Sequence, residues 1–224
     1  MARVIAFDVN ETLLDLGALD QDFVNIFGEA AVRREWFSQM LQSALVATVT
    51  GVYTDFGTTG IAALDMLAAR HGINLTDADR QSIRESMRRL PPHLEVRASL
   101  ERLRDAGLRM VTLTNSTEVV ATAQITNAGL RDLFEQVLSA DAVRRLKPAP
   151  EAYHMAAAQL GVPISEVRLV AAHAWDIAGA LRAGCAAAFV ARPGMVLDPL
   201  VERPDIIGSN LREIADQIIA VECG

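Results

Sequence analysis

Short apolar runs alternate along this chain with longer segments of helical periodicity. The short runs, bounded by turn residues, predict buried parallel strands at Arg3–Asp8, Arg109–Thr114, Gln136–Ser139, Val167–Ala171 and Ala187–Ala191, with a weaker sixth at Asp205–Ile207. The segments between them predict helices at Ala98–Ala106, Val119–Ala128, Ala149–Leu160, Asp176–Ala183 and Asn210–Val221. Strands and helices that alternate at this spacing form βαβ units, so we expect an α/β fold built on a parallel sheet.

A helical segment interrupts this alternation after the first strand. From about residue 15 to about residue 92 no strand pattern appears, and helical patterns occupy Ala30–Val46, Gly60–His71 and Thr76–Leu90. Ligands of open α/β sheets bind beyond the carboxyl ends of the strands, so an insert that leaves the first strand there would cover the site as a cap. We therefore expect a Rossmann-like parallel sheet core, residues 1–14 and 93–224, with an all-helical cap of residues 15–92.

Composition and charge restrict the class of protein. Hydrophobic residues make up 51% of the chain and charged residues 22%, which is enough apolar side chain for a buried core. The net charge of −7 argues against general nucleic-acid binding, because binding phosphates requires a basic surface. No apolar run reaches the roughly 18 residues of a membrane span, and the N-terminus lacks a signal-peptide pattern. The two cysteines, Cys185 and Cys223, are too few for a disulfide framework, and we expect a cytoplasmic protein.

Polar side chains that could carry chemistry follow several of the predicted strands. Asp8 ends the first strand, where a carboxylate can act as a nucleophile or metal ligand, although a turn or helix-capping role is the alternative. Thr114 and Asn115 end the second strand, where they could bind an anion beside a helix N-terminus or only cap that helix.

Two further charged residues complete this set. Lys147 lies in a proline-bounded loop, where it could neutralise a carboxylate, and otherwise it would be an ordinary exposed lysine. Asp176 follows the fourth strand and could accept a proton from water or bond to Lys147, although the helix dipole alone would also favour it. Because the carboxyl ends of parallel strands meet at one edge, we expect one shared site, with His173 and Trp175 at its mouth.

The order and spacing of these residues resemble the haloacid dehalogenase (HAD) superfamily. Its first motif has a nucleophilic aspartate with a threonine four residues later, here Asp8 and Thr12. Its second motif ends a strand at Thr114, its third supplies Lys147, and its fourth is an acidic loop that ends at Asp176. The resemblance covers essentially the whole chain, including a helical cap between the first two motifs.

The sequence departs from the magnesium-dependent phosphatases of that superfamily. These carry a second aspartate two residues after the nucleophile as general acid, and Asn10 stands at that position here. Their fourth motif begins with a metal-binding aspartate, where this chain has Ala172. Mg²⁺ prefers oxygen ligands, and Ala172 supplies none. The resemblance therefore implies a site with no metal and no other cofactor.

The remaining details are similar to the type II (S)-2-haloacid dehalogenases. The Lys-Pro-x-x-x-x-Tyr run of that family is here Lys147–Tyr153, and its Asn-Ala-Trp-Asp ending is His173–Asp176. Tyr53–Phe56 and Leu103–Leu108 also match. The resemblance implies a hydrolase acting on carbon–halide bonds.

The mechanism that the resemblance implies has two steps. Asp8 displaces the leaving group of a short 2-substituted carboxylate, and water then hydrolyses the Asp8 ester. Lys147 would hold Asp8, Thr12 would bind Asp8 or the substrate carboxylate, and Asp176 would activate the water. We expect the substrate-binding residues to be Thr114, Asn115, Asn10, Phe37, His173, Tyr153 and Trp175.

Three positions depart from the dehalogenase pattern. Phe37 stands where these enzymes have an arginine that draws off the halide, and Arg33 and Arg34 lie one helical turn earlier, on other expected faces of the helix. Ala171 and His173 replace a serine and an asparagine that orient the hydrolytic water. His173 could do that work as a hydrogen-bond partner or base, or could face solvent from its loop.

Other interpretations stay open at this point. The same nucleophile could attack another carbon electrophile, such as the strained ring of azetidine carboxylate. A magnesium-dependent phosphatase or an inactive HAD-like binding protein is less favoured. Members of the family often pair through the cap, so Leu41–Val49 could form a homodimer contact or pack within the cap. These residues do not specify the stereochemistry or the leaving group of the substrate, a small organic acid.

Overall fold

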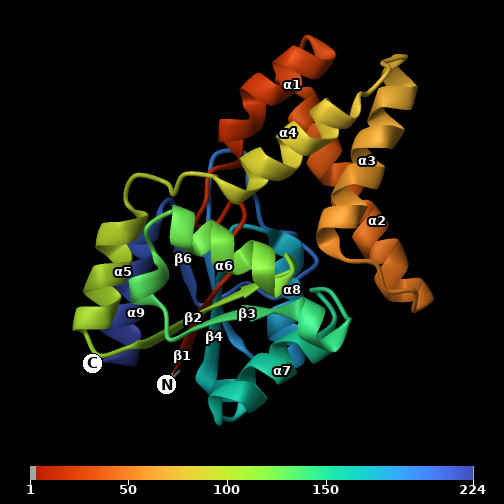
Figure 1. Cartoon of the computed structure of the whole chain (residues 1–224). Coiled ribbons are helices and arrows are strands. Elements are labelled where there is room, and N and C mark those ends of the chain that lie inside the picture. The colour runs from red at the N-terminus through yellow and green to blue at the C-terminus, as the bar shows by residue number, and fades with distance from the viewer. Residues whose placement is uncertain (1–3, 224) are drawn as a thin grey trace.

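A six-stranded parallel sheet forms the centre of the computed structural model, which describes residues 4–223 (Figure 1). The strand order is β3-β2-β1-β4-β5-β6, with bounds β1 (Val4–Phe7), β2 (Arg109–Thr114), β3 (Gln136–Ser139), β4 (Val167–Ala171), β5 (Ala186–Val190) and β6 (Ile206–Gly208). The predicted α/β fold with a parallel sheet is confirmed. Arg3, the predicted first strand residue, lies outside the described part of the chain, as do residues 1, 2 and 224.

Helices cover both faces of this sheet (Figure 1). They are α5 (Val96–Asp105), α6 (Glu118–Asn127), α7 (Pro150–Leu160), α8 (Ala174–Ala183) and α9 (Leu211–Glu222), with the 3-10 turns η2 (Arg131–Leu133), η3 (Ala140–Val143) and η4 (Ile164–Glu166). In β1, Ile5 and Phe7 pack with α5 and α9, whereas Val4 and Ala6 pack with α7 and α8. A sheet buried on both faces explains why its strands are continuous apolar runs.

Helices alone occupy the segment between β1 and α5. After η1 (Leu16–Leu19) come α1 (Asp20–Phe27), α2 (Val32–Thr50), α3 (Phe56–His71) and α4 (Asp77–Arg88), which gather to one side of the sheet (Figure 1). The entry and exit of this segment lie together, because the Asp15 N–H donates to the Pro91 carbonyl at 2.8 Å. Helix α1 is absent from the prediction, since its apolar stripe of Phe23, Ile26 and Phe27 lies in a helix of only eight residues.

The long helix α2 carries the segment considered for a homodimer contact. Ala44 is buried, while Leu45, Val46 and Val49 are exposed. Residues 41–49 thus contribute both to packing within the helices and to an apolar surface. The homodimer stays a prediction.

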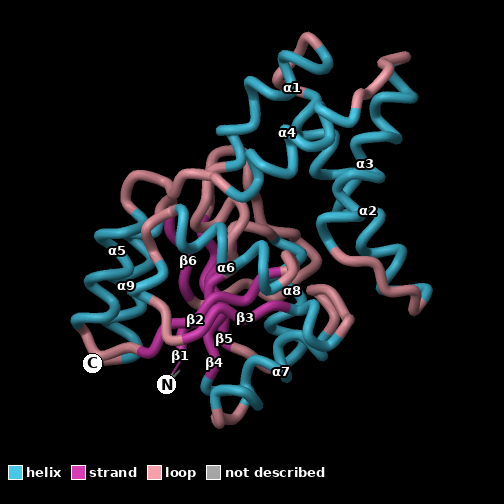
Figure 2. Tube along the Cα trace, in the orientation of Figure 1, coloured by secondary structure: helices cyan, strands magenta, loops and turns pink. Residues whose placement is uncertain are grey.

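The central strand β1 carries the first motif to one edge of the sheet. Phe7 is in register with Thr112 of β2 and with Val170 of β4, so the three strands end side by side. Loops at this edge lie between the sheet and helices α1–α4 (Figure 2). Within residues 4–223 no helix is both long and apolar enough to span a bilayer. Both cysteines, buried Cys185 and exposed Cys223, are free.

Candidate active site

Asp8 and Asp176 lie on either side of one buried ammonium group, that of Lys147. The Lys147 Nζ donates to Asp8 Oδ1 at 2.9 Å, to Asp176 Oδ2 at 2.6 Å and to the Leu113 carbonyl at 2.7 Å. These bonds use all three donors of the ammonium group. The structure thus brings together three residues that the sequence places after three different strands.

The sheet and one carboxamide position these groups. Asp8 follows β1, and its N–H donates to the Val170 carbonyl at 3.0 Å, which extends the pairing with β4. The Asn115 Oδ1 accepts from the Lys147 N–H at 2.8 Å, and its Nδ2 donates to the Lys147 carbonyl at 3.2 Å. Asn115 therefore fixes the loop that carries Lys147. It does not cap α6, whose N-cap residue is Thr117.

Lys147 is the only lysine of this chain, and every other strongly basic side chain is an arginine. An ammonium group is compact and donates in three directions, whereas a guanidinium is a planar fork. Three acceptors, on Asp8, Asp176 and Leu113, share the single nitrogen Nζ, which suits an ammonium group and not a guanidinium. The presence of a single lysine in the chain therefore points to Lys147 independently of the spacing of the motifs.

Asp176 has both carboxylate oxygens engaged. The Tyr153 hydroxyl donates to Oδ1 at 2.5 Å, while Lys147 holds Oδ2. Gly179 on α8 permits this approach, because a Cβ there would lie 2.5 Å from Tyr153 Oη and 2.6 Å from Pro148 Cβ. Gly179 is a supporting residue that sequence reasoning misses, since a glycine within a helix carries no chemical signal. Tyr153, expected from the sequence to bind substrate, contacts Asp176 in the structure.

Thr12 holds the second oxygen of Asp8. Its Oγ1 donates to Asp8 Oδ2 at 2.6 Å and accepts from the Ala172 N–H at 2.9 Å. The Arg192 guanidinium also donates to the Thr12 carbonyl at 2.8 Å. The Asp8 carboxylate is therefore fixed at both oxygens, by Lys147 and by Thr12.

His173 is buried beside Asp8. The alternative of a loop histidine facing solvent is wrong, because the residue is 6% exposed. Its Nδ1 lies 3.5 Å from Asp8 Oδ2, and its Nε2 lies 2.8 Å from Glu11 Oε2. Phe37 and Trp175 pack against the ring, with centroids 5.7 Å and 5.3 Å away. His173 is thus held between two carboxylates and two aromatic rings.

Glu11 belongs to this site although the sequence does not single it out. Besides its contact with His173, it lies 3.7 Å from the Arg33 guanidinium of α2. Its φ of +62° falls in the left-handed region, which residues other than glycine rarely occupy. Its place beside Thr12 in the first motif is the available sequence signal, but the direction of its side chain depends on tertiary contacts.

Thr114 and Asn10 are buried near this edge and have partners in the neighbouring loops. The Thr114 hydroxyl accepts from the Ser116 N–H at 3.2 Å. Asn10 Oδ1 accepts from Gln124 Nε2 at 3.0 Å, and Asn10 Nδ2 lies 3.5 Å from Ser116 Oγ. Among the described residues, these bonds tie Thr114 to the loop before α6 and Asn10 to that loop and to Gln124 within α6, and neither side chain to Asp8.

The charges around Asp8 determine its protonation. Burial by itself would raise the pKa of Asp8, but Lys147 and then His173 hold it well below its ordinary value. Burial raises the pKa of Asp176 above its ordinary value despite the adjacent Lys147. Burial opposes the charge on Lys147, yet Asp176 and Asp8 raise its pKa overall. Asp8 is therefore the carboxylate kept ionised, as a nucleophile requires.

Comparison with known proteins agrees with this arrangement. Residues 2–184 match the family of haloacid dehalogenase-like hydrolases. The chain belongs to this family. The (S)-2-haloacid dehalogenase of Pseudomonas sp. (strain YL) is 30% identical over 216 residues, 95% of this chain and 92% of that protein. The (S)-2-haloacid dehalogenase 2 of Pseudomonas sp. (strain CBS-3) is 29% identical over 214 residues, 95% and 93% of the two chains.

A solved structure shows the same architecture. The L-2-haloacid dehalogenase of Xanthobacter autotrophicus is similar with a TM-score of 0.91, at 25% identity, over 97% of this chain and 98% of that one. The resemblance inferred from the motifs is thereby confirmed. This haloacid dehalogenase-like hydrolase has its sheet and its helical segment in the arrangement of that enzyme.

The side chains of this haloacid dehalogenase-like hydrolase do not fit a Mg²⁺ site. A cation between Asp8 and Asp176 would face the Lys147 ammonium, which already contacts both. Ala172 offers no carboxylate. Over residues 4–223, no three histidine, cysteine, aspartate or glutamate side chains form a group that could hold a metal ion.

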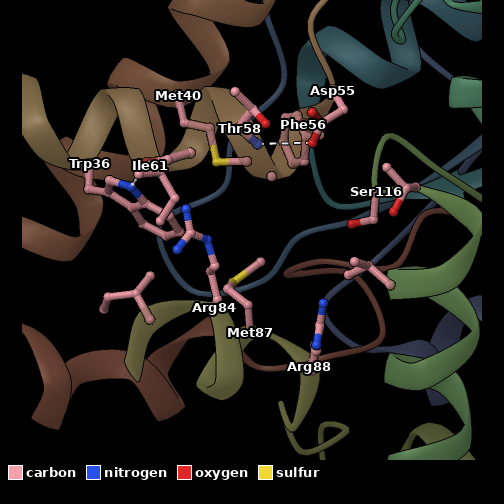
Figure 3. Close-up of a pocket in the computed structure, with 15 residues that line it drawn as sticks. Trp36, Met40, Asp55, Phe56, Thr58, Ile61, Arg84, Met87, Arg88 and Ser116 are labelled. Carbon is pink, nitrogen blue, oxygen red and sulfur yellow. Dashed lines mark hydrogen bonds between the residues drawn. The ribbon is translucent and has the colours of Figure 1, made fainter. Parts of the chain in front are cut away.

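Two cavities adjoin the site in this hydrolase. One, of about 290 Å³, lies between α2, α3, α4 and the start of α6; its lining includes Trp36, Met40, Phe56, Arg84, Arg88 and Ser116 (Figure 3). The other, of about 580 Å³, has a lining that includes Glu11, Arg33, Arg34, Phe37, His173 and Trp175.

The second cavity corrects an expectation about the arginines of α2. Arg33 and Arg34 are expected on other faces than Phe37, yet all three line this cavity. Arg33 precedes Phe37 by four residues, and residues at that spacing lie on one face of a helix. Arg33 pairs with Asp20 at 2.5 Å and lies near Glu11, so it carries its charge to the His173 side of the site.

Proposed function

We propose that this hydrolase cleaves the carbon–halogen bond of short 2-haloacids through an ester of Asp8, without a metal ion. The observation that carries the proposal is the Asp8 carboxylate, buried and bound at one oxygen by Lys147 and at the other by Thr12. A carboxylate fixed in place and stripped of water is well suited to attack carbon. The relatives named (S)-2-haloacid dehalogenases support the same substrate class.

The proposed reaction needs two bond exchanges at Asp8. In the first, a carboxylate oxygen attacks C2 of the haloacid, and the halide departs with the electron pair of the carbon–halogen bond. In the second, water adds to the Asp8 carbonyl carbon and the ester bond to that carbon breaks, which releases the 2-hydroxyacid and one proton. Lys147 contacts both Asp8 and Asp176, so it keeps Asp8 in place while the charge of Asp8 is lost and restored.

We also propose that residues 15–92 act as a cap and that the substrate lies beneath it. The cavity of about 290 Å³ supports this placement, since α4 supplies Arg84 and Arg88 and the core supplies Ser116 (Figure 3). Guanidinium groups attract the carboxylate of an organic acid, and Trp36 and Phe56 offer apolar surface to its carbon chain.

Halide release in the presence of EDTA tests the proposed function. Chloroacetate and the two enantiomers of 2-chloropropionate are incubated with wild type and with Asp8→Asn, and the enzyme mass is measured after turnover in ¹⁸O-labelled water. We expect halide release by wild type alone, with label entering Asp8, because water attacks the carbonyl carbon of the ester. Absence of halide release from all of these acids would contradict the proposal.

A further inference from the structure

His173 places a nitrogen without a hydrogen-bond partner beside the Asp8 carboxylate. Its Nδ1 is buried, makes no hydrogen bond to any residue of 4–223 and lies 3.5 Å from Asp8 Oδ2. The bond between Nε2 and Glu11, at 2.8 Å, and the flanking rings of Phe37 and Trp175 fix the imidazole. The ring therefore has one orientation, in which Nδ1 faces Asp8.

Asp176 is poorly placed to activate water. A general base must come within about 2.6–3.2 Å of the group whose proton it takes, or reach it through one water. Asp176 is fully buried, and its two oxygens accept from Tyr153 and Lys147. Asp176 also lines neither the cavity of about 290 Å³ nor the cavity of about 580 Å³. His173, in contrast, lines the cavity of about 580 Å³.

We propose that His173, oriented by Glu11, is the general base that takes a proton from the water attacking the Asp8 ester. This assignment rests on the ester mechanism proposed above. It gives His173 the role that family resemblance implies for Asp176. Glu11 acts as a positioning residue through its bond to Nε2.

The charge of Asp8 determines when His173 becomes a base. In the resting site burial lowers the pKa of His173, but Asp8 and Glu11 raise it overall to about 9, so the ring is cationic at neutral pH. Formation of the ester removes the negative charge of Asp8, and the pKa of His173 then falls. The ring releases its proton to solvent at this stage, when a base is needed.

Other charged groups around the ring favour this change. The charged and titratable groups that surround it are Asp8, Glu11 and Asp15 after β1, Arg33 and Arg34 of α2, His93 before α5, Lys147 before α7, Asp176 of α8 and Arg192 after β5. Once Asp8 is neutral, the arginine and lysine cations among them disfavour the positive charge of the protonated ring. Glu11 remains and keeps the ring oriented.

The hydrolytic step balances with His173 as base. The neutral imidazole takes a proton from water as the hydroxide oxygen adds to the Asp8 carbonyl carbon. The bond from that carbon to the ester oxygen then breaks, and the hydroxyacid leaves with this oxygen and one proton. Asp8 returns as a carboxylate and His173 as its cation, while the water oxygen stays in Asp8.

The backbone of Glu11 supports a positioning role. A side chain held at a φ of +62° is uncommon outside glycine, and such conformations gather where the surrounding structure needs a particular side-chain direction. Here that direction is toward His173 Nε2. A glycine at this position would adopt the same backbone and would leave the imidazole without its carboxylate partner.

The test compares wild type with His173→Gln, Glu11→Gln and the control His154→Gln, which changes an exposed histidine of α7. Halide release from 2-chloropropionate, the mass of enzyme quenched during turnover and the pH profile of kcat are measured. We expect His173→Gln to lower kcat by about 10²- to 10⁴-fold and to accumulate the Asp8 ester, because the first step does not use the base. His154→Gln should match wild type.

Glu11→Gln separates a positioning role from a structural one. Loss of the Glu11 charge lowers the pKa of His173, so the acidic limb of the kcat profile should move to lower pH while kcat falls. A structural role alone would lower kcat and leave that limb in place. Thermal unfolding checks that each variant folds, and His173→Asn, whose amide orients water but takes no proton, replaces the glutamine variant if that one does not.

The outcomes distinguish the two proposals. If wild type turns over, and the His173 variants either turn over equally fast or accumulate no ester, only the assignment of His173 is overturned. Absence of both halide and ester in wild type would overturn the proposed function and this inference with it.

Discussion

The backbone N–H of Ala172 donates to Thr12 Oγ1 at 2.9 Å, and this bond determines where the Thr12 hydroxyl proton points. With one lone pair taken by Ala172, the hydroxyl donates to Asp8 Oδ2 at 2.6 Å. The loop after β4 is in this way joined to the first motif after β1. One side-chain oxygen fixes both the Asp8 carboxylate and the relative position of two strand ends.

Replacement of Thr12 by Val tests this relationship. Valine keeps the shape of the side chain but leaves the buried Ala172 N–H unsatisfied, which costs about 1–3 kcal/mol. We expect the free energy of unfolding to fall by that amount and halide release to slow, because Asp8 loses a donor. Urea denaturation and halide assays measure both. Thr12→Ser retains the hydroxyl and serves as the matched control; equal behaviour of the two variants would contradict the argument.

Lys147→Arg should abolish activity although it preserves the charge. A planar guanidinium does not reproduce the bonds of Nζ to Asp8, Asp176 and Leu113. Halide release measures the effect. Because Lys147 is the only lysine, its Nζ gives a single resonance in protein labelled with ¹⁵N-lysine, which reports its protonation directly. Wild-type turnover by the arginine variant would show that point charge alone suffices.

Lys147→Met should destabilise the fold in a pH-dependent way. Removal of Lys147 takes the adjacent cation from two buried carboxylates, Asp176 and Asp8, of which Asp8 keeps His173 at 3.5 Å, a loss of about 3–5 kcal/mol. The depressed pKa of Asp8 stabilises the folded state above the pKa of an unfolded aspartate, and loss of Lys147 reduces this stabilisation to the part that His173 and Thr12 supply. The difference in the free energy of unfolding between the variant and wild type should shrink at mildly acidic pH, because the carboxylates of the variant take up protons there. Urea denaturation at mildly acidic and mildly alkaline pH measures it.

Much of the sheet is predictable from the sequence, because each strand buried on both faces is a short apolar run between turn residues. β2, β3 and β4 begin and end at the predicted residues. The helical segment is less regular. Helix α1 buries only Phe23, and α2 continues to Thr50 past the exposed Val46 and Val49, which periodicity alone cannot assign to helix or loop.

The convergence of Asp8, Lys147 and Asp176 is likewise predictable, since each follows a parallel strand of one sheet. The partnership of Glu11 with His173 is not, because it depends on a left-handed backbone and on side-chain directions that only tertiary packing fixes. The contact of Arg33 with this site follows from a four-residue spacing visible in the sequence, and a helical projection of α2 would have shown it.

His173 should give the protein a stability that changes with pH. Its pKa, lowered by burial but raised overall by Asp8 and Glu11, is about 9 in the folded state against an ordinary value of 6.5. A raised folded pKa contributes stability that is complete below pH 6.5 and is lost as the pH rises through about 9. Relative to His173→Gln, wild type should therefore lose up to about 3 kcal/mol over this window. A pH-independent difference in urea denaturation would contradict the assignment.

Gly179→Ala should disturb the site from a position that carries no chemistry. In an exposed helix this change stabilises by about 1 kcal/mol, but here the new Cβ would lie 2.5 Å from Tyr153 Oη and 2.9 Å from the Pro148 carbonyl oxygen. Relief requires movement of the Pro148 backbone, which carries Lys147 with it, so we expect a loss of about 1–3 kcal/mol and slower halide release. Tyr153→Phe removes the nearer of the two obstacles. Gly179→Ala should therefore reduce the free energy of unfolding less in a Tyr153→Phe background than in wild type. Strictly additive effects of the two substitutions would show that the hydroxyl is not the obstacle.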